Sequence, residues 1–316
     1  LTYRTDVPQE GRIRSGDSTL DMRVSTFPTL FGEKTVVRLL RTSDRLSHVH
    51  ELGLPQTLEQ QLRDTLGRRS GVLLVAGPAG SGKTTTLYAC LRELAGKGDQ
   101  PLSLVSLEDP IESVVTGVAQ SQVNPAAGFD YATGLRSLMR QDPEVIMVGE
   151  IRDSETAKIA IQAALTGHMV FSTLHTNDAA GAISRLLDMG VEDYLLASSL
   201  LGVLAQRLVR SLCKNCATEV DGGSEVVPAD QQGAGPAKVF EAAGCSECAG
   251  TGYLGRMGIY ELLQVDDSIR KLILERAPAD RIKAGAGMRT LRDDGWTKVR
   301  QGTTTVAEVL RVSQEE

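Results

Sequence analysis

The residues from Gly77 to Thr84 form the clearest chemical pattern in the sequence. They read Gly-Pro-Ala-Gly-Ser-Gly-Lys-Thr, which matches the spacing G-x-x-x-x-G-K-[ST] at every fixed position. The match follows an apolar run and precedes a helical pattern, which is the context that a phosphate-binding loop requires. Glycines let backbone N–H groups turn toward phosphate oxygens, and the start of a helix adds partial positive charge. The pattern predicts a nucleoside triphosphate site.

Within this loop, we expect Lys83 to reach the β- and γ-phosphates and the Thr84 hydroxyl to bind magnesium. A chance match in a glycine-rich turn is on the order of one in a hundred per chain from average residue usage, so we set it aside. The residues expected to bind nucleotide are Gly77, Pro78, Ala79, Gly80, Ser81, Gly82, Lys83, Thr84 and Thr85.

Two glutamates stand where phosphoryl transfer needs an acidic group, at the ends of neighbouring strands. The apolar run Val145–Val148 leads to Glu150, and the run Leu104–Leu107 leads to Glu108. The ends of adjacent parallel strands border one crevice, so both carboxylates can face the γ-phosphate. A lone glutamate is more often an exposed strand-end residue. The phosphate loop on the same sheet favours the catalytic interpretation instead.

Four of the five cysteines form two Cys-x-x-Cys pairs, Cys213 with Cys216 and Cys245 with Cys248. Two such pairs joined by a loop are typical of a tetrahedral zinc site, and four thiolates leave no open position, which indicates a structural role. A redox function is the competing interpretation, but neither pair begins a helix in a βαβ unit. The fifth, Cys90, is expected to be a buried apolar residue.

The elements that position these residues alternate between strand and helix from residue 71 onward. This alternation predicts an α/β fold with a parallel sheet flanked by helices. The expected strands are 72–76, 102–107, 145–148 and 169–174, and the expected helices are 84–94, 131–140 and 154–165, the last capped by Asp153.

The flanking segments have other patterns. Residues 1–45 read as strands at 12–14, 20–25 and 35–40, and because the chain opens with Leu1 we expect them to end a β-containing domain that starts earlier. The pattern predicts a helix over 56–66, only helices over 178–210, a polar loop over 221–238, and helices from Asp266 to near Val312.

The amino-acid composition and charge argue against several classes of function. With 34 Lys and Arg against 40 Asp and Glu, the formal net charge is −6. That balance argues against a dedicated duplex-DNA binder, which usually presents a basic face. No run of about 18 apolar residues is present, so no membrane span is predicted. Paired cysteines, too few for a disulfide scaffold, indicate metal in a reducing compartment such as the cytosol.

Several segments resemble the motifs of one protein family. Glu108–Pro110 resembles its aspartate box, Gly149–Asp153 its Walker B segment and Thr166–Asn177 its histidine box, while Arg23–Thr26 and Arg38–Leu40 resemble the arginine-bearing strands of the preceding domain. The order and spacing of these motifs are coherent over essentially the whole chain. The sequence is therefore similar to the type II secretion and type IV pilus assembly ATPases, which are cytoplasmic hexameric motors with a RecA-like core.

The resemblance implies roles for individual residues. Glu150 would be the main catalytic carboxylate, Glu108 would help position water or the hydrated magnesium, and His175 would contact the γ-phosphate region. For His168, a structural role and a functional role stay equally open. Arg136 and Arg140 form an i, i+4 pair: they lie either on a solvated helix face or, as matching arginines do in the family, near the subunit boundary.

The site described so far lacks a cation to offset charge developing on the γ-phosphate. Arg68 and Arg69 precede the first strand of the sheet, at the wrong end for this task. Arg23 and Arg38 stand in the preceding domain, before a linker that would let this domain close over a nucleotide as in the family. We expect these two arginines to complete the site in a closed state that the hexamer stabilises.

The expected layout follows the family. It comprises 1–45 as the C-terminal part of a PAS-like N-terminal domain, 46–55 as a linker, 56–210 as a RecA-like ATPase core, 211–255 as a tetracysteine zinc module and 256–316 as a C-terminal helical region. The module occurs in the assembly and secretion motors of the family and is absent from its retraction motors, so retraction is disfavoured.

The function implied is an ATP-hydrolysing motor with ATP, magnesium and zinc as ligands. It would power pilus or pseudopilus assembly through an inner-membrane platform protein and a membrane-anchored docking partner, and would be cytoplasmic and peripheral to the inner membrane. The alternative is a nucleic-acid-translocating P-loop motor of the packaging or conjugation type, which the acidic balance and the 4% aromatic content weaken. A nucleotide-binding zinc scaffold without hydrolysis has no need of both glutamates.

Overall fold

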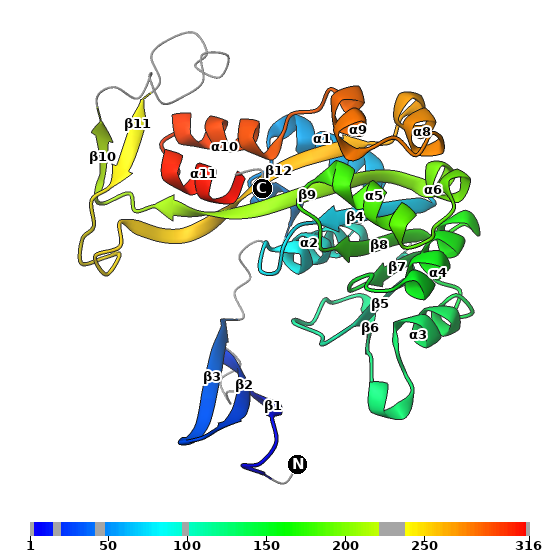
Figure 1. Ribbon diagram of the computed structural model, residues 1–316, viewed down its shortest axis with the longest axis horizontal. Coiled ribbons are helices and arrows are strands. Elements are labelled where there is room, and N and C mark those ends of the chain that lie inside the picture. Colours follow the sequence, from blue (N-terminus) through cyan, green and yellow to red (C-terminus); the bar gives the residue numbers. More distant parts are fainter. Residues whose placement is uncertain (1–2, 15–19, 42–47, 97–100, 221–237, 314–316) are drawn as a thin grey trace. The chain divides into compact units, whose positions relative to one another are not determined.

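A computed structural model of the chain describes residues 3–14, 20–41, 48–96, 101–220 and 238–313. The contacts divide the chain into two units, Leu1–Arg45 and Leu46–Glu316 (Figure 1). The polar loop expected over 221–238 lies almost wholly outside the described residues.

The first unit is a three-stranded antiparallel sheet of β1 (Gln9–Arg14), β2 (Leu20–Thr29) and β3 (Gly32–Arg41). The strands expected in this region are confirmed. Arg23 on β2 stands directly opposite Arg38 on β3, and its Nη2 lies 2.6 Å from Glu10 Oε2. The unit therefore places two arginines side by side on one face of a sheet.

The second unit is built around a seven-stranded sheet in the order β12-β9-β4-β8-β7-β5-β6. Every neighbouring pair is parallel except β12 and β9, which are antiparallel. The α/β prediction is confirmed, with a mixed rather than fully parallel sheet. The strands are β4 (Gly71–Ala76), β5 (Leu104–Glu108), β6 (Val118–Gln122), β7 (Val145–Val148), β8 (Met169–Leu174), β9 (Leu200–Leu212) and β12 (Tyr253–Gln264).

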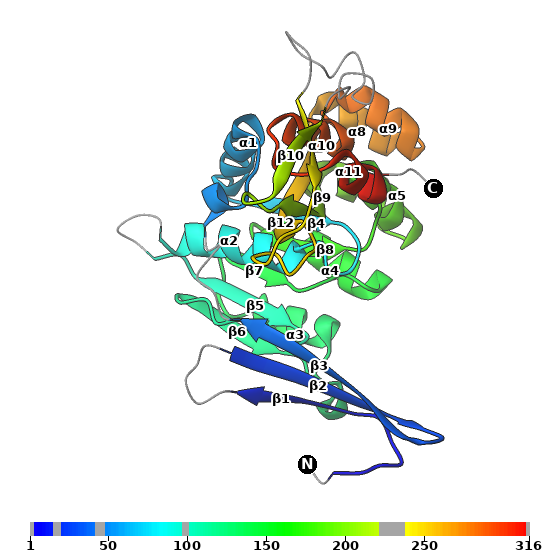
Figure 2. The same ribbon diagram turned by 90° about the vertical axis from the view of Figure 1, so that its left-hand side faces the viewer.

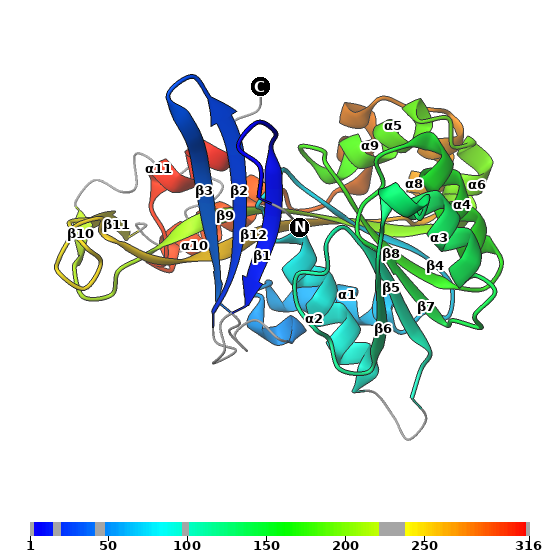
Figure 3. The same cartoon turned by 90° about the horizontal axis from the view of Figure 1, so that it is seen from below.

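Helices cover both faces of this sheet, as Figures 2 and 3 show. The central strand β4 is buried on both sides: Leu73 and Val75 pack with one set of helices, and Val72, Leu74 and Ala76 with the other. The first set is α1 (Gln56–Leu66) and α2 (Lys83–Ala95), and the second includes α3 (Tyr131–Leu138), α4 (Ser154–Leu165), α5 (Ala179–Asp188) and α6 (Asp193–Ser199). Of the described helices, none has both the length and the apolar character to cross a membrane.

Local sequence signals account for several element boundaries. The helices expected over 56–66 and 154–165 have those bounds. Asp153 caps α4 as predicted, because its Oδ1 accepts a hydrogen bond of 2.8 Å from the Thr156 backbone N–H.

Two expectations about the later chain are wrong. Residues 178–210 are not all helical, since β9 begins at Leu200, and the region from 256 opens with the rest of β12 before its first helix. Residues Leu200–Ala205 are apolar and mostly buried because the strand has helices on both faces. Such a run lacks the period-2 alternation of a half-exposed strand and is indistinguishable from a buried helix by periodicity.

Strands β9 and β12 extend beyond the sheet as a long two-stranded ribbon (Figure 1). The hairpin of β10 (Ala217–Val220) and β11 (Val239–Ala242) lies at the far end of this ribbon. The C-terminal helices expected from Asp266 onward are confirmed. They are α8 (Asp267–Leu274), α9 (Ala279–Ala286), α10 (Leu291–Arg300) and α11 (Val306–Ser313).

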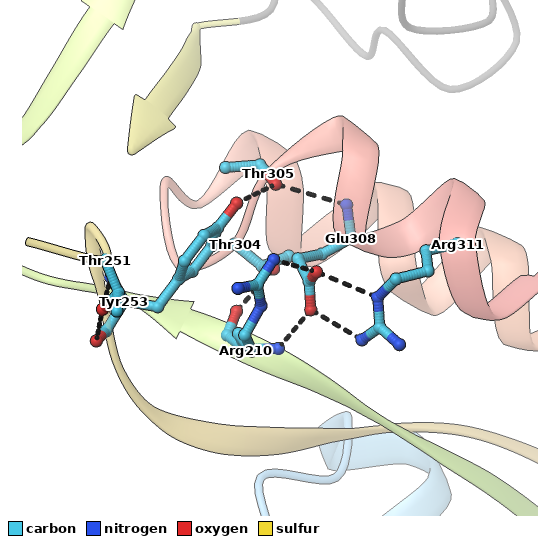
Figure 4. Close-up of polar contacts among 7 residues, drawn as sticks. All are labelled: Arg210, Thr251, Tyr253, Thr304, Thr305, Glu308 and Arg311. Carbon is cyan, nitrogen blue, oxygen red and sulfur yellow. Dashed lines mark hydrogen bonds and ion pairs between the residues drawn. The ribbon is translucent and has the colours of Figure 1, made fainter. Parts of the chain in front are cut away.

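A buried glutamate fastens α11 to the ribbon (Figure 4). Glu308 is 1% exposed, and its two carboxylate oxygens accept hydrogen bonds from the Arg210 backbone and guanidinium and from the Arg311 guanidinium, at 2.8 to 3.0 Å. The Arg210 guanidinium also stacks on the Tyr253 ring, 3.9 Å from its centroid. Burial alone would raise the pKa of Glu308, but the hydrogen bonds from Arg311 and Arg210 outweigh it and lower that pKa to about 2.

We predict that Glu308→Gln lowers the free energy of unfolding by about 3 kcal/mol at pH 7, because two arginines lose their buried anion. A carboxyl whose folded pKa lies below its ordinary 4.5 stabilises the fold above that pH, and this contribution fades as the pH falls toward 2. Urea unfolding at pH 7 and pH 4 should therefore show the difference from wild type narrowing. The exposed Glu241 provides the control Glu241→Gln. A difference independent of pH would contradict this account.

Candidate functional site

The predicted phosphate loop joins β4 to α2 and depends on glycine at two positions. Gly77 has a φ of +149°, and a Cβ there would lie 2.5 Å from the Gln206 backbone oxygen. Gly82 has a φ of +89° and precedes the first turn of α2. Side chains at these positions would clash with β9 or strain the backbone. Strand, tight loop and helix thus have the arrangement that the motif predicts.

Lys83 lies inside the loop. Its Nζ donates hydrogen bonds to the carbonyl oxygens of Gly77 at 2.8 Å and Pro78 at 3.0 Å. Burial lowers the pKa of Lys83, the nearby negative charge of Glu150 opposes this shift, and the positive charge of Arg207 adds to it. The ammonium is therefore held against backbone carbonyls, at the place where the motif would bind phosphate oxygens.

Gln206 on β9 holds the loop and was not predicted from the sequence. Its Nε2 donates to the Ser81 backbone oxygen at 2.6 Å, and its Oε1 accepts from the Thr86 hydroxyl at 2.7 Å. The residue is 1% exposed. One side chain therefore connects the loop with the first turns of α2. In the sequence, the signal for this role is one amide side chain directly after the apolar run Leu200–Ala205.

Glu150 follows β7 and faces polar partners. The Arg152 guanidinium donates to its carboxylate, and the His175 Nε2 lies 3.4 Å from Oε2. Burial works to raise the pKa of Glu150, but Arg152, and then the charges of His175 and Lys83, hold it below its ordinary value. The side chain is 18% exposed. Glu150 is thus an ionised, accessible carboxylate near the loop.

Glu108 has a different environment. It is 2% exposed, accepts a short hydrogen bond from the Tyr88 hydroxyl, and has the Ser106 hydroxyl at 2.5 Å and the Gln120 amide at 3.0 Å. These partners lie on α2, β5 and β6. Both glutamates end neighbouring strands as predicted, but Glu108 is enclosed by protein groups whereas Glu150 is partly exposed.

The structure also describes the histidine and arginines whose roles were open. His168 lies before β8, at the opposite end of that strand from His175, and its Nδ1 is 2.8 Å from the Ala163 carbonyl oxygen. Arg136 forms an ion pair with Glu155 between α3 and α4, and the Arg140 guanidinium donates to the Arg136 carbonyl at 2.9 Å. The contact with the Ala163 carbonyl favours a structural role for His168.

The two cysteine pairs occupy the turns between β9 and β10 and between β11 and β12, and their four sulfur atoms lie within 4.8 Å of one another. Backbone N–H groups of Cys245 and Gly252 donate to Cys248 Sγ at 3.2 and 3.1 Å. These hydrogen bonds lower the pKa of the Cys248 thiol despite its burial. Such hydrogen bonds stabilise the thiolate form that metal ions bind.

The spacing of the sulfur atoms fits a tetrahedral ion. Zn–S bonds of about 2.3 Å imply sulfur atoms roughly 3.8 Å apart. The sulfur atoms are 3.9 Å apart for Cys213 and Cys245, 3.8 Å for Cys216 and Cys248, and 3.7 Å for Cys245 and Cys248. The cluster is therefore compatible with zinc. Cys90 lies apart from it on α2, buried in the core as expected.

Comparison with known proteins decides the family. A family model described as "Type II/IV secretion system protein" matches residues 3–311. The chain belongs to this family. The resemblance inferred from the motifs is confirmed.

Curated relatives within the family carry two kinds of name. The chain is 48% identical over 314 residues to the type II secretion system ATPase E of Vibrio cholerae, covering 98% of this chain and 62% of that protein. It is 46% identical over 317 residues to the type IV pilus assembly ATPase PilB of Thermus thermophilus, covering 96% of this chain and 35% of that protein. The chain thus spans less than two thirds of these relatives.

A solved structure of the pilus retraction motor PilT with bound ADP is similar to the chain, with a TM-score of 0.71 and 26% identity. The similarity covers 98% of this chain and 78% of that one. The fold class expected for a RecA-like motor of this family is confirmed.

The loop analysis gives a prediction about Gln206. We expect Gln206→Leu to lower the free energy of unfolding by about 2 to 4 kcal/mol, because the buried Ser81 carbonyl and Thr86 hydroxyl lose their partner. Chemical unfolding measures this change. Gln264→Leu, at the exposed end of β12, is the matched control and should be nearly neutral. Equal stability of the two variants would mean that the bridge contributes nothing.

Proposed function

We propose that the chain is the catalytic part of an ATP-hydrolysing hexameric motor that powers assembly of a pilus or pseudopilus. The observation that carries the proposal is the juxtaposition of a complete phosphate loop with an ionised, accessible glutamate. Glu150 lies close enough to Lys83 for each charge to shift the pKa of the other. Magnesium bound to ATP would be held by the Thr84 hydroxyl and by carboxylates at the strand ends.

The roles of the site residues follow from their surroundings. Glu150 is the catalytic carboxylate, which activates or orients the attacking water, and His175 beside it contacts the γ-phosphate region. Glu108, which is enclosed by protein groups, would help to position the water or the hydrated magnesium. Residues 77–85 bind the phosphates. Enzymes of this type use electrostatics and positioning rather than covalent chemistry.

Arg23 and Arg38 are proposed to complete the site from the N-terminal unit. They stand opposite each other on β2 and β3, and like charges placed opposite each other in a sheet repel. The ion pair of Arg23 with Glu10 offsets part of that repulsion, and a polyphosphate would offset the rest. The closed state that brings them to the nucleotide is proposed to depend on neighbouring subunits of the hexamer, so hydrolysis per chain rises with protein concentration.

The proposal also covers the machine, the compartment and the partners with which the chain would work. The names of the relatives refer to type II secretion and type IV pilus assembly, and the four-cysteine cluster matches the module expected of assembly motors. The motor would be cytoplasmic and would reach the inner membrane through a platform protein and a membrane-anchored docking partner.

The proposed layout keeps a PAS-like domain remnant over 1–45, a linker over 46–55, the ATPase core over 56–210, the zinc module over 211–255 and the C-terminal region over 256–316. Strands β9 and β12 cross the boundaries of the module.

We predict slow ATP hydrolysis by the isolated chain, because a motor without its platform lacks the partner that organises its ring. Glu150→Gln should lower turnover at least a hundredfold and retain ATP binding, since the amide keeps the shape and loses the charge. Lys83→Ala should lose ATP binding as well. Phosphate release and equilibrium ATP binding measure the two effects.

The matched control is Glu275→Gln, an exposed glutamate at the end of α8. Wild-type turnover in Glu150→Gln would refute the assignment of the catalytic carboxylate. Salt-sensitive DNA binding by the chain would instead favour a nucleic-acid motor.

We further predict one zinc ion per chain, held by Cys213, Cys216, Cys245 and Cys248. Cys213→Ser should release the metal and unfold the hairpin region, because in a structural site the binding energy is folding energy. The core around the phosphate loop should survive. Elemental analysis and limited proteolysis measure these outcomes, with Cys90→Ala as a control that retains zinc. Metal-free protein with an intact hairpin would rule out the site.

A further inference from the structure

Arg207 occupies a position beside the phosphate loop that no motif marks. Strand β4 ends at Ala76, which pairs with Leu174 of β8 on one side and Ala205 of β9 on the other. Residues 206 and 207 therefore continue past the end of β4, where the chain turns into the loop at Gly77. Gln206 turns toward the loop and α2. Because side chains alternate along a strand, Arg207 extends over the opposite face.

The contacts of Arg207 reach the segment that carries His175. Its Nη2 donates to the Asn177 backbone oxygen at 2.8 Å and lies 3.3 Å from the Asn177 side-chain oxygen. Asn177 follows β8, which pairs with β4 on the side away from β9. The side chain of Arg207 thus spans the end of β4, from one neighbouring strand to the segment after the other.

The charge of Arg207 has no ion-pair partner among the described residues. The acidic groups that act on it, Glu261 and Asp178, are engaged elsewhere. Glu261 accepts hydrogen bonds from the backbone N–H groups of Ala179 and Leu291 at 2.8 and 3.0 Å. Asp178 caps α5 through the Gly181 N–H at 2.7 Å. Within the described part of the chain, the buried Nε of Arg207 has no hydrogen-bond acceptor.

Two cations therefore flank the loop: Lys83 belongs to it, and Arg207 follows Gln206, which contacts Ser81. Burial and the positive charge of Arg207 both lower the pKa of Lys83, and only Glu150 opposes them. Lys83 and Arg207 bind neutral carbonyl oxygens rather than carboxylates. Two cations that share a region and hydrogen-bond only to neutral oxygens can exchange these oxygens for those of an anion. One anion could then bridge both cations.

We propose that Arg207 is a nucleotide-binding residue of the same subunit, which exchanges the Asn177 carbonyl for an oxygen of the terminal phosphate of ATP. This inference rests on the proposed ATPase function. The terminal phosphate is assigned because Arg207 already contacts the segment of His175, which lies 3.4 Å from Glu150. The exchange replaces a neutral acceptor with a charged one, and a guanidinium fork matches phosphate geometry.

This arrangement supplies a cation from within the subunit. The hydrogen-bond partner of Arg207 would then depend on whether the terminal phosphate is bound. When Arg207 leaves Asn177, the segment from His175 to Asn177 loses its tie to β9, so nucleotide state would be linked to the start of α5.

Equilibrium binding of the non-hydrolysable analogue AMP-PNP and of ADP, both with magnesium, tests the proposal. Arg207→Gln should raise the Kd for AMP-PNP by about ten- to a hundredfold, the loss expected for one charged hydrogen bond. The Kd for ADP should change less than about threefold. Arg207→Lys, which keeps the charge and loses the fork, should fall between wild type and Arg207→Gln.

Arg270→Gln on α8 is the matched control, because it removes an exposed arginine that pairs only with Asp267 among the described residues. Equal losses for both nucleotides would overturn the assignment to the terminal phosphate. Unchanged binding of AMP-PNP would overturn Arg207 as a ligand. If Arg207→Gln does not fold, as judged by thermal unfolding without nucleotide, Arg207→Lys decides by the same criteria. Wild-type protein that binds neither nucleotide would refute the ATPase proposal itself.

Discussion

The pairing of β9 with β4 is the constraint on which the phosphate site depends. Lys83 supplies partners for the Gly77 and Pro78 carbonyls, but the buried Ser81 carbonyl takes its partner from a neighbouring element. Strand β9 does this through Gln206, whose amide contacts Ser81 and Thr86. The same strand passes so close to Gly77 that a Cβ would not fit there. The glycines of the loop allow it to fold back on itself, and its contacts with β9 hold it in one conformation.

The sequence predicted what is encoded by local patterns, and missed what depends on contacts between distant segments. The phosphate loop, the strand-end glutamates, the cysteine pairs and the Asp153 cap all have short-range signatures. The sequence predicts helix where strand β9 begins, because a strand buried on both faces has no alternation. Gln206 and Arg207 carry no motif, since their roles come from lying beside a loop about 125 residues earlier in the chain. The enclosure of Glu108 likewise arises from Tyr88 and Gln120 on other elements.

Burial separates the two glutamates that the sequence had placed together. Both follow neighbouring strands, yet Glu150 is partly exposed and contacts charged groups while Glu108 contacts hydroxyls and an amide in the interior. A carboxylate surrounded by neutral donors is fixed in position, whereas one paired with arginine and histidine can exchange partners as charges change. Two acids of the same type are thereby suited to different tasks, one to hold geometry and the other to respond to substrate.

The length of β9 has a mechanical consequence. The strand contacts the phosphate loop at Gln206, is fastened to α11 at Arg210 and reaches the cysteine cluster at Cys213. Seven residues of extended chain cover roughly 23 Å. A pleated strand paired with β12 over most of its length resists compression and bending, so it would behave as a lever arm. A small tilt at the nucleotide end would be delivered at the hairpin as a larger displacement.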